Sequence, residues 1–184
     1  MHIKLPAFFT FIDVLNEHYI RKLDKKIAII YRNYSTTDDE QLILSIKKIC
    51  RESGRKFFLS NNLKMAKNLN LDGVYLPAFN IKENTKNTIL KKKFIIIGSA
   101  HSIKEIRIKE RQGAKLIFIS PLFKNIKNNK FLNPVKFNLL ASKTNKKIIA
   151  LGGITVKNLK KLKLTKAYGF AAISYFKNND KIKL

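Results

Sequence analysis

Eight short apolar segments alternate with longer amphipathic segments along the chain. Several of them are apolar without interruption, which is typical of strands that are buried on both faces of a parallel sheet. Their first residues are 16 to 32 positions apart, a spacing that suits crossover connections and is too long for hairpins. The pattern predicts parallel strands at residues 8–12, 27–31, 57–59, 73–76, 94–98, 116–120, 148–151 and 169–173.

Helix signals occupy the segments between these strands. Asp38 or Asp39 can accept hydrogen bonds from the first turn of a helix that ends at Gly54. Ser102 can cap a second helix, which ends at Gly113. Repeated strand–helix units predict a (β/α)8 barrel that forms one domain over residues 1–184, with brief helices because the chain is short for this fold. An open doubly wound sheet is the alternative.

Composition places the chain among globular proteins. Of its 184 residues, 45% are hydrophobic and 27% are charged, which allows a sizeable core and excludes global disorder. No apolar run approaches the roughly 20 residues of a membrane span, so we expect no membrane partner. The single cysteine, Cys50, excludes a disulfide within the chain and a zinc site built from cysteines. We find no secretory signal at the N-terminus and therefore expect a cytoplasmic protein.

The net charge of +26 favours an anionic partner. However, Lys, Ile and Asn account for 75 of the 184 residues, and all three have A/T-rich codons, so a biased genome explains much of the charge. Selection for nucleic-acid contacts would also favour Arg, yet the chain has 32 Lys and 6 Arg and carries no recognisable nucleic-acid-binding motif. We expect a phosphorylated small molecule as the partner, keep a noncatalytic nucleic-acid-binding protein as an alternative, and leave homo-oligomers open.

Two glycines and a serine follow the last two predicted strands. In a (β/α)8 barrel, function lies at the carboxyl ends of the strands, and the loops after the seventh and eighth strands commonly bind phosphate. Gly152 and Gly153 would let backbone N–H groups approach an anion, and Ser174 would add a hydroxyl group. The sequence therefore predicts a phosphate site here, with a simple tight turn and a helix cap as the alternative.

Other chemically competent residues follow the remaining strands. His101 directly follows the fifth strand and can act as a general acid or base, or be a hydrogen-bonded histidine at the rim. Arg32 ends the second strand and can bind a ligand anion or form a structural ion pair. Pro121 and Phe123 follow the sixth strand, where they can form the wall of a pocket for a flat ligand or simply close the core.

Five segments in order resemble the thiamine phosphate synthase and TenI-like family. They are LDGVYLP, IIGSAH, GAKLIFISPLFKN, IIALGGIT and YGFAAIS, and the resemblance is strongest over residues 27–176. It implies a (β/α)8 barrel that joins an aminopyrimidine, activated as its pyrophosphate, to a thiazole phosphate. Magnesium would hold the pyrophosphate, and the protein would contribute mainly orientation and electrostatics.

The resemblance also reveals departures from the family pattern. Of the family's Gln-x-Arg-x-Lys motif only Arg32 is retained, which implies a catalytic role for it beside His101. Asn61 and Asn80 stand where the family has metal-binding aspartates, and an amide oxygen can ligate Mg²⁺ but supplies no charge. Asn61 and Lys127, one of three lysines near the family's loop lysine, are expected to bind substrate. A TenI-like protein that binds or isomerises a thiazole phosphate without synthase activity is the alternative.

Overall fold

The computed structural model describes residues 4–35, 39–83, 89–124 and 129–177 and shows a closed barrel of parallel strands. Neighbouring strands pair in chain order, and β8 closes the ring by pairing with β1. The strands are β1 (Phe8–Ile12), β2 (Ile27–Tyr31), β3 (Phe57–Ser60), β4 (Gly73–Leu76), β5 (Ile95–Ala100), β6 (Leu116–Ile119), β7 (Lys147–Leu151) and β8 (Gly169–Ala171). The predicted (β/α)8 barrel is confirmed, and the open sheet is wrong.

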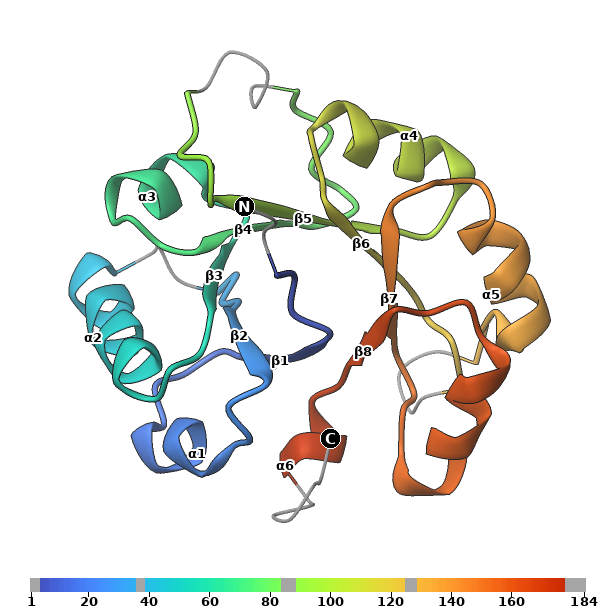
Figure 1. The fold of residues 1–184 in the computed structure, drawn as a ribbon, viewed down its shortest axis with the longest axis horizontal. Coiled ribbons are helices and arrows are strands. Elements are labelled where there is room, and N and C mark those ends of the chain that lie inside the picture. The colour runs from blue at the N-terminus through green and yellow to red at the C-terminus, as the bar shows by residue number, and fades with distance from the viewer. Residues whose placement is uncertain (1–3, 36–38, 84–88, 125–128, 178–184) are drawn as a thin grey trace.

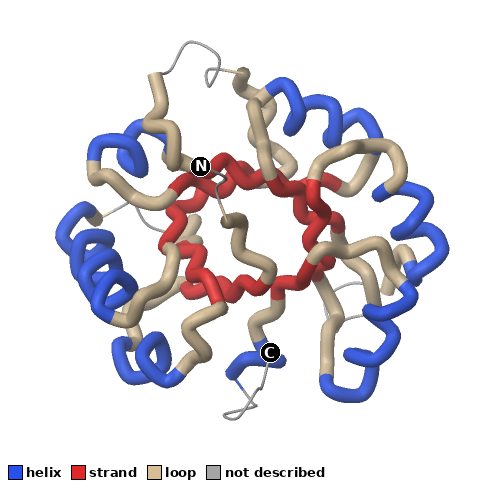
Figure 2. Tube along the Cα trace, in the orientation of Figure 1, coloured by secondary structure: helices blue, strands red, loops and turns tan. Residues whose placement is uncertain are grey.

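Helices surround the barrel on the outside (Figure 1), and Figure 2 shows the ring of strands within them. They are α1 (Glu17–Lys22), α2 (Glu40–Glu52), α3 (Leu63–Asn68), α4 (Ile103–Arg111), α5 (Asn133–Ala141), the 3₁₀ helix η1 (Val156–Leu164) and α6 (Ser174–Lys177). The described residues between β4 and β5 form no helix. No described helix has the length and apolar character that crossing a membrane requires.

Local signals define the helix ends as the sequence predicts. The side chain of Asp39 accepts hydrogen bonds from the N–H groups of Gln41 and Leu42 at the start of α2. The hydroxyl of Ser102 accepts one from the N–H of Glu105 at the start of α4. These caps satisfy N–H groups that have no partner within their own helix.

The barrel interior is a packed aromatic core. Side chains alternate between the two faces of each strand, so one set fills the barrel and the other packs against the helices. Phe118 contacts Phe9, Phe11 and Tyr75, with ring centroids 5.0 to 6.2 Å apart. At the N-terminal end of the barrel, Leu5 packs against the same interior cluster. The aromatic layer therefore forms a floor beneath the carboxyl ends of the strands.

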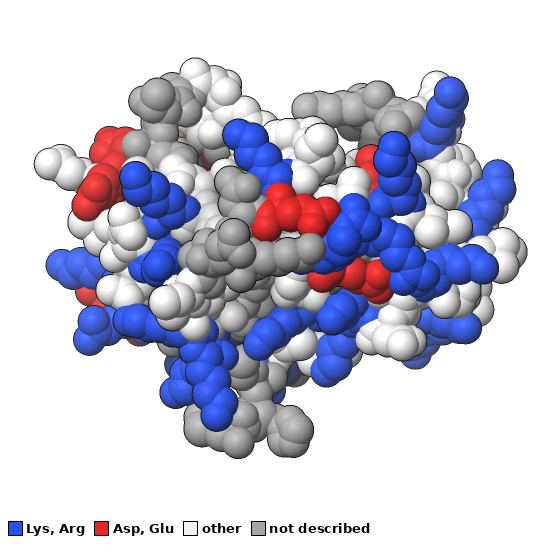
Figure 3. Space-filling view, turned by 90° about the horizontal axis from the view of Figure 1, so that it is seen from above, with Lys and Arg blue, Asp and Glu red and all other residues white. Residues whose placement is uncertain are grey.

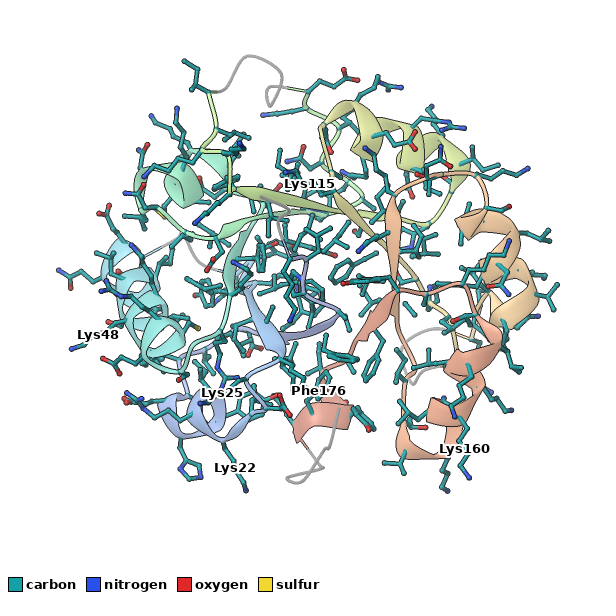
Figure 4. The ribbon with its side chains drawn as sticks, in the orientation of Figure 1. Lys22, Lys25, Lys48, Lys115, Lys160 and Phe176 are labelled. Atoms are coloured by element: carbon teal, nitrogen blue, oxygen red, sulfur yellow. The ribbon has the colours of Figure 1, made fainter. Side chains whose placement is uncertain are left out.

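Basic side chains are scattered over the face of the molecule that Figure 3 shows. Figure 3 shows Lys and Arg spread across the visible face, with Asp and Glu among them rather than one continuous basic stripe. In Figure 4, Lys22 of α1, Lys48 of α2 and Lys160 of η1 lie on separate elements at the outside, whereas Phe176 lies by the barrel. This distribution supports compositional bias as the origin of the charge.

Candidate functional site

The candidate site lies at the rim formed by the carboxyl ends of the strands. Because all strands are parallel, the residues that follow them meet at this one end of the barrel. Leu151 of β7 pairs with Ala171 of β8, so the segments carrying the two glycines and Ser174 leave the sheet side by side. The predicted residues at this rim are Arg32, Asn61, Asn80, His101, Pro121, Phe123, Gly152, Gly153 and Ser174. Lys127 lies outside the described residues.

Arg32 places a positive charge above the aromatic floor. Its guanidinium carbon lies 4.4 Å from the centre of the Phe11 ring, a cation–π contact. Tyr75 lies in the same floor, and burial raises its pKa to about 12, although a hydrogen bond with Ser99 and the charge of Arg32 act in the opposite direction. The phenol is therefore protonated at neutral pH. The site combines a flat apolar floor, a neutral hydroxyl group and a fixed cation.

Asn61 and Asn80 come together although they follow different strands. Nδ2 of Asn80 donates a hydrogen bond to Oδ1 of Asn61 over 2.7 Å. Oδ1 of Asn80 accepts from the backbone N–H of Lys82 over 3.1 Å and from Nε2 of Gln112 over 3.2 Å. Asn61 has a φ of +62°, a left-handed conformation that asparagine tolerates better than most residues. Both amide oxygens therefore already accept hydrogen bonds from N–H groups.

Two buried residues of the α4 region support this amide pair, and sequence reasoning missed them. Nζ of Lys109 donates to the carbonyl oxygens of Pro77 and Asn80 over 2.7 and 2.6 Å and to Oε1 of Gln112 over 2.9 Å. Burial lowers the pKa of Lys109 to about 8, with Glu105 opposing the shift. The available signal was spacing, because Lys109 follows the buried Ile106 by three positions on the same helix face.

His101 is held in one tautomer. Its Nδ1 lies 2.8 Å from the carbonyl oxygen of Ser120 and 3.3 Å from the hydroxyl of the same residue, and its backbone N–H donates to the carboxylate of Glu105. A carbonyl oxygen only accepts, so Nδ1 carries a proton, and in the neutral form of the ring Nε2 is the nitrogen with the free lone pair. His101 is exposed at the rim, which suits it to accept a proton from a ligand.

Gly152 and Gly153 have a structural reason to be glycine. Their φ angles are +94° and +68°, which favour glycine. A Cβ on Gly153 would lie 2.3 Å from the carbonyl oxygen of Phe123, and one on Gly152 would lie 2.8 Å from Cβ of Pro121. The glycines therefore let the loop after β6 pack against the loop after β7, which supports the tight-turn alternative without excluding phosphate.

The neighbouring residues extend this picture. Thr155 precedes η1, where its N–H donates to Oδ1 of Asn158, and Nδ2 of Asn158 donates to the carbonyl oxygen of Gly153. Ser174 is exposed at the first position of α6. Phe123 is only 8% exposed and packs between the sheet and the helices, which favours core closure over a ligand wall.

An exposed aromatic pair offers a different wall, and sequence reasoning did not single it out. The ring of Tyr34 lies edge-on to the ring of Phe79, with centroids 5.7 Å apart. The hydroxyl of Tyr34 lies 3.0 Å from the hydroxyl of Ser60, at the end of β3. Because Phe79 directly precedes Asn80, the two aromatic rings lie next to the amide pair formed by Asn61 and Asn80. Its exposed faces can stack against a flat ring.

These residues do not fit a metal ion held by the protein alone. Within the described part of the chain, no three His, Cys, Asp or Glu side chains form a group that could hold a metal. The amide oxygens of Asn61 and Asn80 are turned toward N–H donors. Mg²⁺ prefers octahedral oxygen ligands and usually one or two carboxylates. The predicted metal role of the two asparagines therefore finds no support in the donor set.

A cavity of about 690 Å³ lies at the opposite end of the barrel, where β3, β4 and β5 begin. Cys50 lines it, and burial raises the pKa of this thiol to about 12, so it is not a ready nucleophile. Lys47 and Lys56 line it too, but they already donate to the carbonyl oxygen of Leu69 and to the carboxylate of Asp72. The cavity also lies away from the carboxyl ends of the strands, where function is located in this fold.

Comparisons with known proteins agree with the resemblance in the sequence. A family described as thiamine monophosphate synthase matches residues 18–176. The chain is 29% identical to a thiamine-phosphate synthase of Flavobacterium johnsoniae, over 86% of this chain and 78% of that protein. It is 32% identical to a thiamine-phosphate synthase of Pelagibacter ubique, over 86% of this chain and 79% of that protein.

A solved structure shows the same fold. The thiamine phosphate pyrophosphorylase from Pyrococcus furiosus superposes with a TM-score of 0.75 and covers 92% of this chain and 86% of its own. Sequence identity in that superposition is 20%, so the likeness concerns the arrangement of the backbone.

Proposed function

Because the chain belongs to the thiamine monophosphate synthase family, we propose that it joins an aminopyrimidine diphosphate to a thiazole phosphate and so forms thiamine phosphate. The observation that carries the proposal is the arrangement of two polar ends across one aromatic floor. Asn61 follows β3 and Gly152 follows β7, and these strands are four positions apart in a closed ring of eight. The two ends therefore lie on opposite sides of the rim, as two substrates with separate phosphate groups require.

The reaction asks for orientation and charge stabilisation rather than for a nucleophile of the protein. The bond between the pyrimidine methylene carbon and the diphosphate oxygen breaks, and its electron pair leaves with the diphosphate. The lone pair of the thiazole nitrogen then forms the new carbon–nitrogen bond, so atoms and electrons balance without a protein proton. Positioned groups that oppose developing charge supply most of the rate enhancement in such a step.

Each part of the rim has a task in this scheme. Arg32 faces the site with a charge that opposes the negative charge developing on the leaving diphosphate. Tyr34 and Phe79 stack against the pyrimidine ring. Gly152, Gly153 and Ser174 bind the phosphate of the thiazole, with the hydroxyl of Ser174 as a donor. Within residues 4–35, 39–83, 89–124 and 129–177 no three acidic, His or Cys side chains form a metal site, so a Mg²⁺ ion that takes part comes with the diphosphate. We place the reaction in the cytoplasm, on free phosphorylated metabolites.

Product formation tests the proposal directly. Purified protein is incubated with both substrates, and thiamine phosphate is quantified by mass spectrometry. We expect product from the wild type, and Arg32→Ala should lower kcat by about tenfold or more because it removes a charge that opposes the transition-state charge. Lys22→Ala, on the outside of α1, is the matched control and should leave the rate unchanged. No product from a folded wild-type protein would refute the synthase activity.

One observation favours a second function. His101 presents Nε2 as a proton acceptor at the rim, and the synthase reaction uses no such base. A TenI-like isomerase acting on a thiazole phosphate would use it. His101→Ala separates the two functions, because it should abolish an isomerase and spare a synthase.

A further inference from the structure

Four polar side chains form one continuous hydrogen-bonded relay beneath and across the diphosphate end of the site. Nζ of Lys109 donates to Oε1 of Gln112 over 2.9 Å, and Nε2 of Gln112 donates to Oδ1 of Asn80 over 3.2 Å. Nδ2 of Asn80 donates in turn to Oδ1 of Asn61 over 2.7 Å. The relay begins at a fully buried ammonium group and ends at an exposed amide on the rim.

The ammonium group gives the first bond of this relay its direction, and the other bonds are consistent with it. It can donate and cannot accept, so Gln112 must present its oxygen to Lys109 and its NH₂ group to Asn80. Asn80 then accepts from Gln112 with its oxygen and donates to Asn61 with its NH₂ group. Asn61 accepts with its oxygen, so its NH₂ group takes no part in the hydrogen bonds of the relay.

Independent contacts hold the same orientation. Nε2 of Gln112 also donates to the carbonyl oxygens of Asn80 and Lys82, over 3.0 and 2.8 Å, and carbonyl oxygens cannot donate. The backbone N–H of Lys82 donates to Oδ1 of Asn80. Lys109 and Gln112 are both 0% exposed, so water cannot replace a lost partner without a local opening. If the amide of Gln112 or Asn80 were flipped, its oxygen would face other oxygens and its NH₂ group would face N–H donors.

We propose that Lys109 is a positioning residue that turns the Asn61–Asn80 end into a hydrogen-bond donor surface, which binds the diphosphate oxygens of the substrate directly. N–H groups attract anionic oxygens and repel a cation, so this end of the site takes the diphosphate without a metal ion bridging it to the protein. The inference rests on the proposed function, since it concerns the diphosphate of that same reaction, and it names how this chain recognises it.

Inorganic diphosphate is the probe, and isothermal titration calorimetry measures its binding in EDTA and in Mg²⁺. We expect the wild type to bind in EDTA within about threefold of its affinity in Mg²⁺, because a donor surface needs no metal bridge. Binding that depends on Mg²⁺ by more than about tenfold, or no binding in either buffer, would overturn the proposal.

Asn80→Asp reverses the last hydrogen bond of the relay, the one between residues 80 and 61. A carboxylate only accepts, so Asn61 must turn its NH₂ group toward Asp and present its oxygen to the site. Affinity for diphosphate in EDTA should fall by about tenfold or more, and Mg²⁺ should restore it because a carboxylate and an amide oxygen now face the ligand. Asn68→Asp adds the same charge at the exposed end of α3 and should change neither value. Equal effects of the two variants would refute the inference.

Lys109→Met tests the origin of the polarity. It keeps an apolar stem of similar length and removes the donor to Oε1 of Gln112, so only the backbone contacts then hold the amides. Affinity for diphosphate in EDTA should fall by about threefold or more. Lys109→Gln restores an N–H donor and should recover part of the loss. Inorganic phosphate binding reports on the glycine end and should stay unchanged in both. If the Lys109 variants fail to fold, the Asn80→Asp measurement alone tests whether the amide pair presents N–H donors to diphosphate.

The synthase assay keeps the two proposals distinguishable. If the protein binds diphosphate in EDTA but forms no product, the proposed synthase activity is refuted and the proposed donor surface stands. If the protein forms product but binds diphosphate only with Mg²⁺, the proposed donor surface is refuted and the proposed synthase activity stands.

Discussion

Gly98→Ala should displace Lys109 from its position under the rim. Gly98 lies in the middle of β5, where its missing side chain makes room for the stem of Lys109 from α4. A Cβ there would lie 2.7 Å from both Cγ and Cδ of Lys109 and 2.8 Å from its Cβ. Ordinary contact between such carbons is about 3.5 to 4.0 Å, so the lysine stem must move by roughly 1 Å.

The cost follows from what that movement breaks. The ammonium of Lys109 is anchored by three hydrogen bonds of 2.6 to 2.9 Å, so the stem cannot shift without stretching them. Hydrogen bonds to charged groups contribute about 1.5 to 3 kcal/mol each, and overpacking a core costs about 1 to 3 kcal/mol. Allowing for partial relaxation, we expect Gly98→Ala to lower the free energy of unfolding by about 2 to 4 kcal/mol.

A double-mutant cycle isolates this contact. In a Lys109→Ala background the stem is gone, and Gly98→Ala should then be neutral or stabilise by about 0.4 to 1 kcal/mol, because alanine restricts the unfolded chain. Urea denaturation of the four proteins, followed by circular dichroism, measures the coupling. Equal costs of Gly98→Ala in the two backgrounds would show that Lys109 is not what requires a glycine in β5.

Three further predictions concern other groups. Because burial raises the pKa of Cys50 to about 12, the thiol should resist a disulfide reagent at pH 8 in the native state and react on unfolding, and fast labelling of the native protein would contradict this. The stability that comes from keeping this thiol protonated should be present below pH 9 and be lost as the pH rises to about 12. Ser174→Ala should weaken binding of a phosphorylated thiazole by about tenfold or more in a titration, through loss of one hydrogen bond to a charged acceptor, and unchanged affinity would remove Ser174 from the site. Gly153→Ala should lower the melting temperature as well as phosphate affinity, because its Cβ meets the backbone of Phe123, and a stable variant would show that the loop after β6 can move.

Local patterns accounted for most of the barrel. Strands buried on both faces are apolar without interruption, so β2, β4 and β6 are recognisable from composition alone. The caps at Asp39 and Ser102 depend on residues within one helical turn, which a single stretch of sequence contains. The parallel arrangement then places the residues after each strand at one rim, which is why the sequence could predict that the candidate residues lie at the same end of the barrel.

Other boundaries were decided by partners distant in the sequence. Apolar residues continue to Ile173, yet β8 ends at Ala171, whose partner Phe9 is the last residue of β1 that pairs with β8. The segment after Thr155 forms the 3₁₀ helix η1, in place of the α-helix that usually links strands in this fold. Phe123, a candidate ligand wall from its position after a strand, turns into the core instead.

The sequence by itself determined the barrel and the rim, because strand periodicity and helix caps are local and parallel strands share one carboxyl end. Only the tertiary structure decided which side chains contact one another at that rim. Lys109 on α4 contacts the carbonyl oxygen of Asn80, 29 positions away, and Asn80 contacts Asn61, 19 positions away. A lysine on a helix and two asparagines after different strands have no relation along the chain, and they acquire one only when the closed barrel brings α4, β3 and the loop after β4 together.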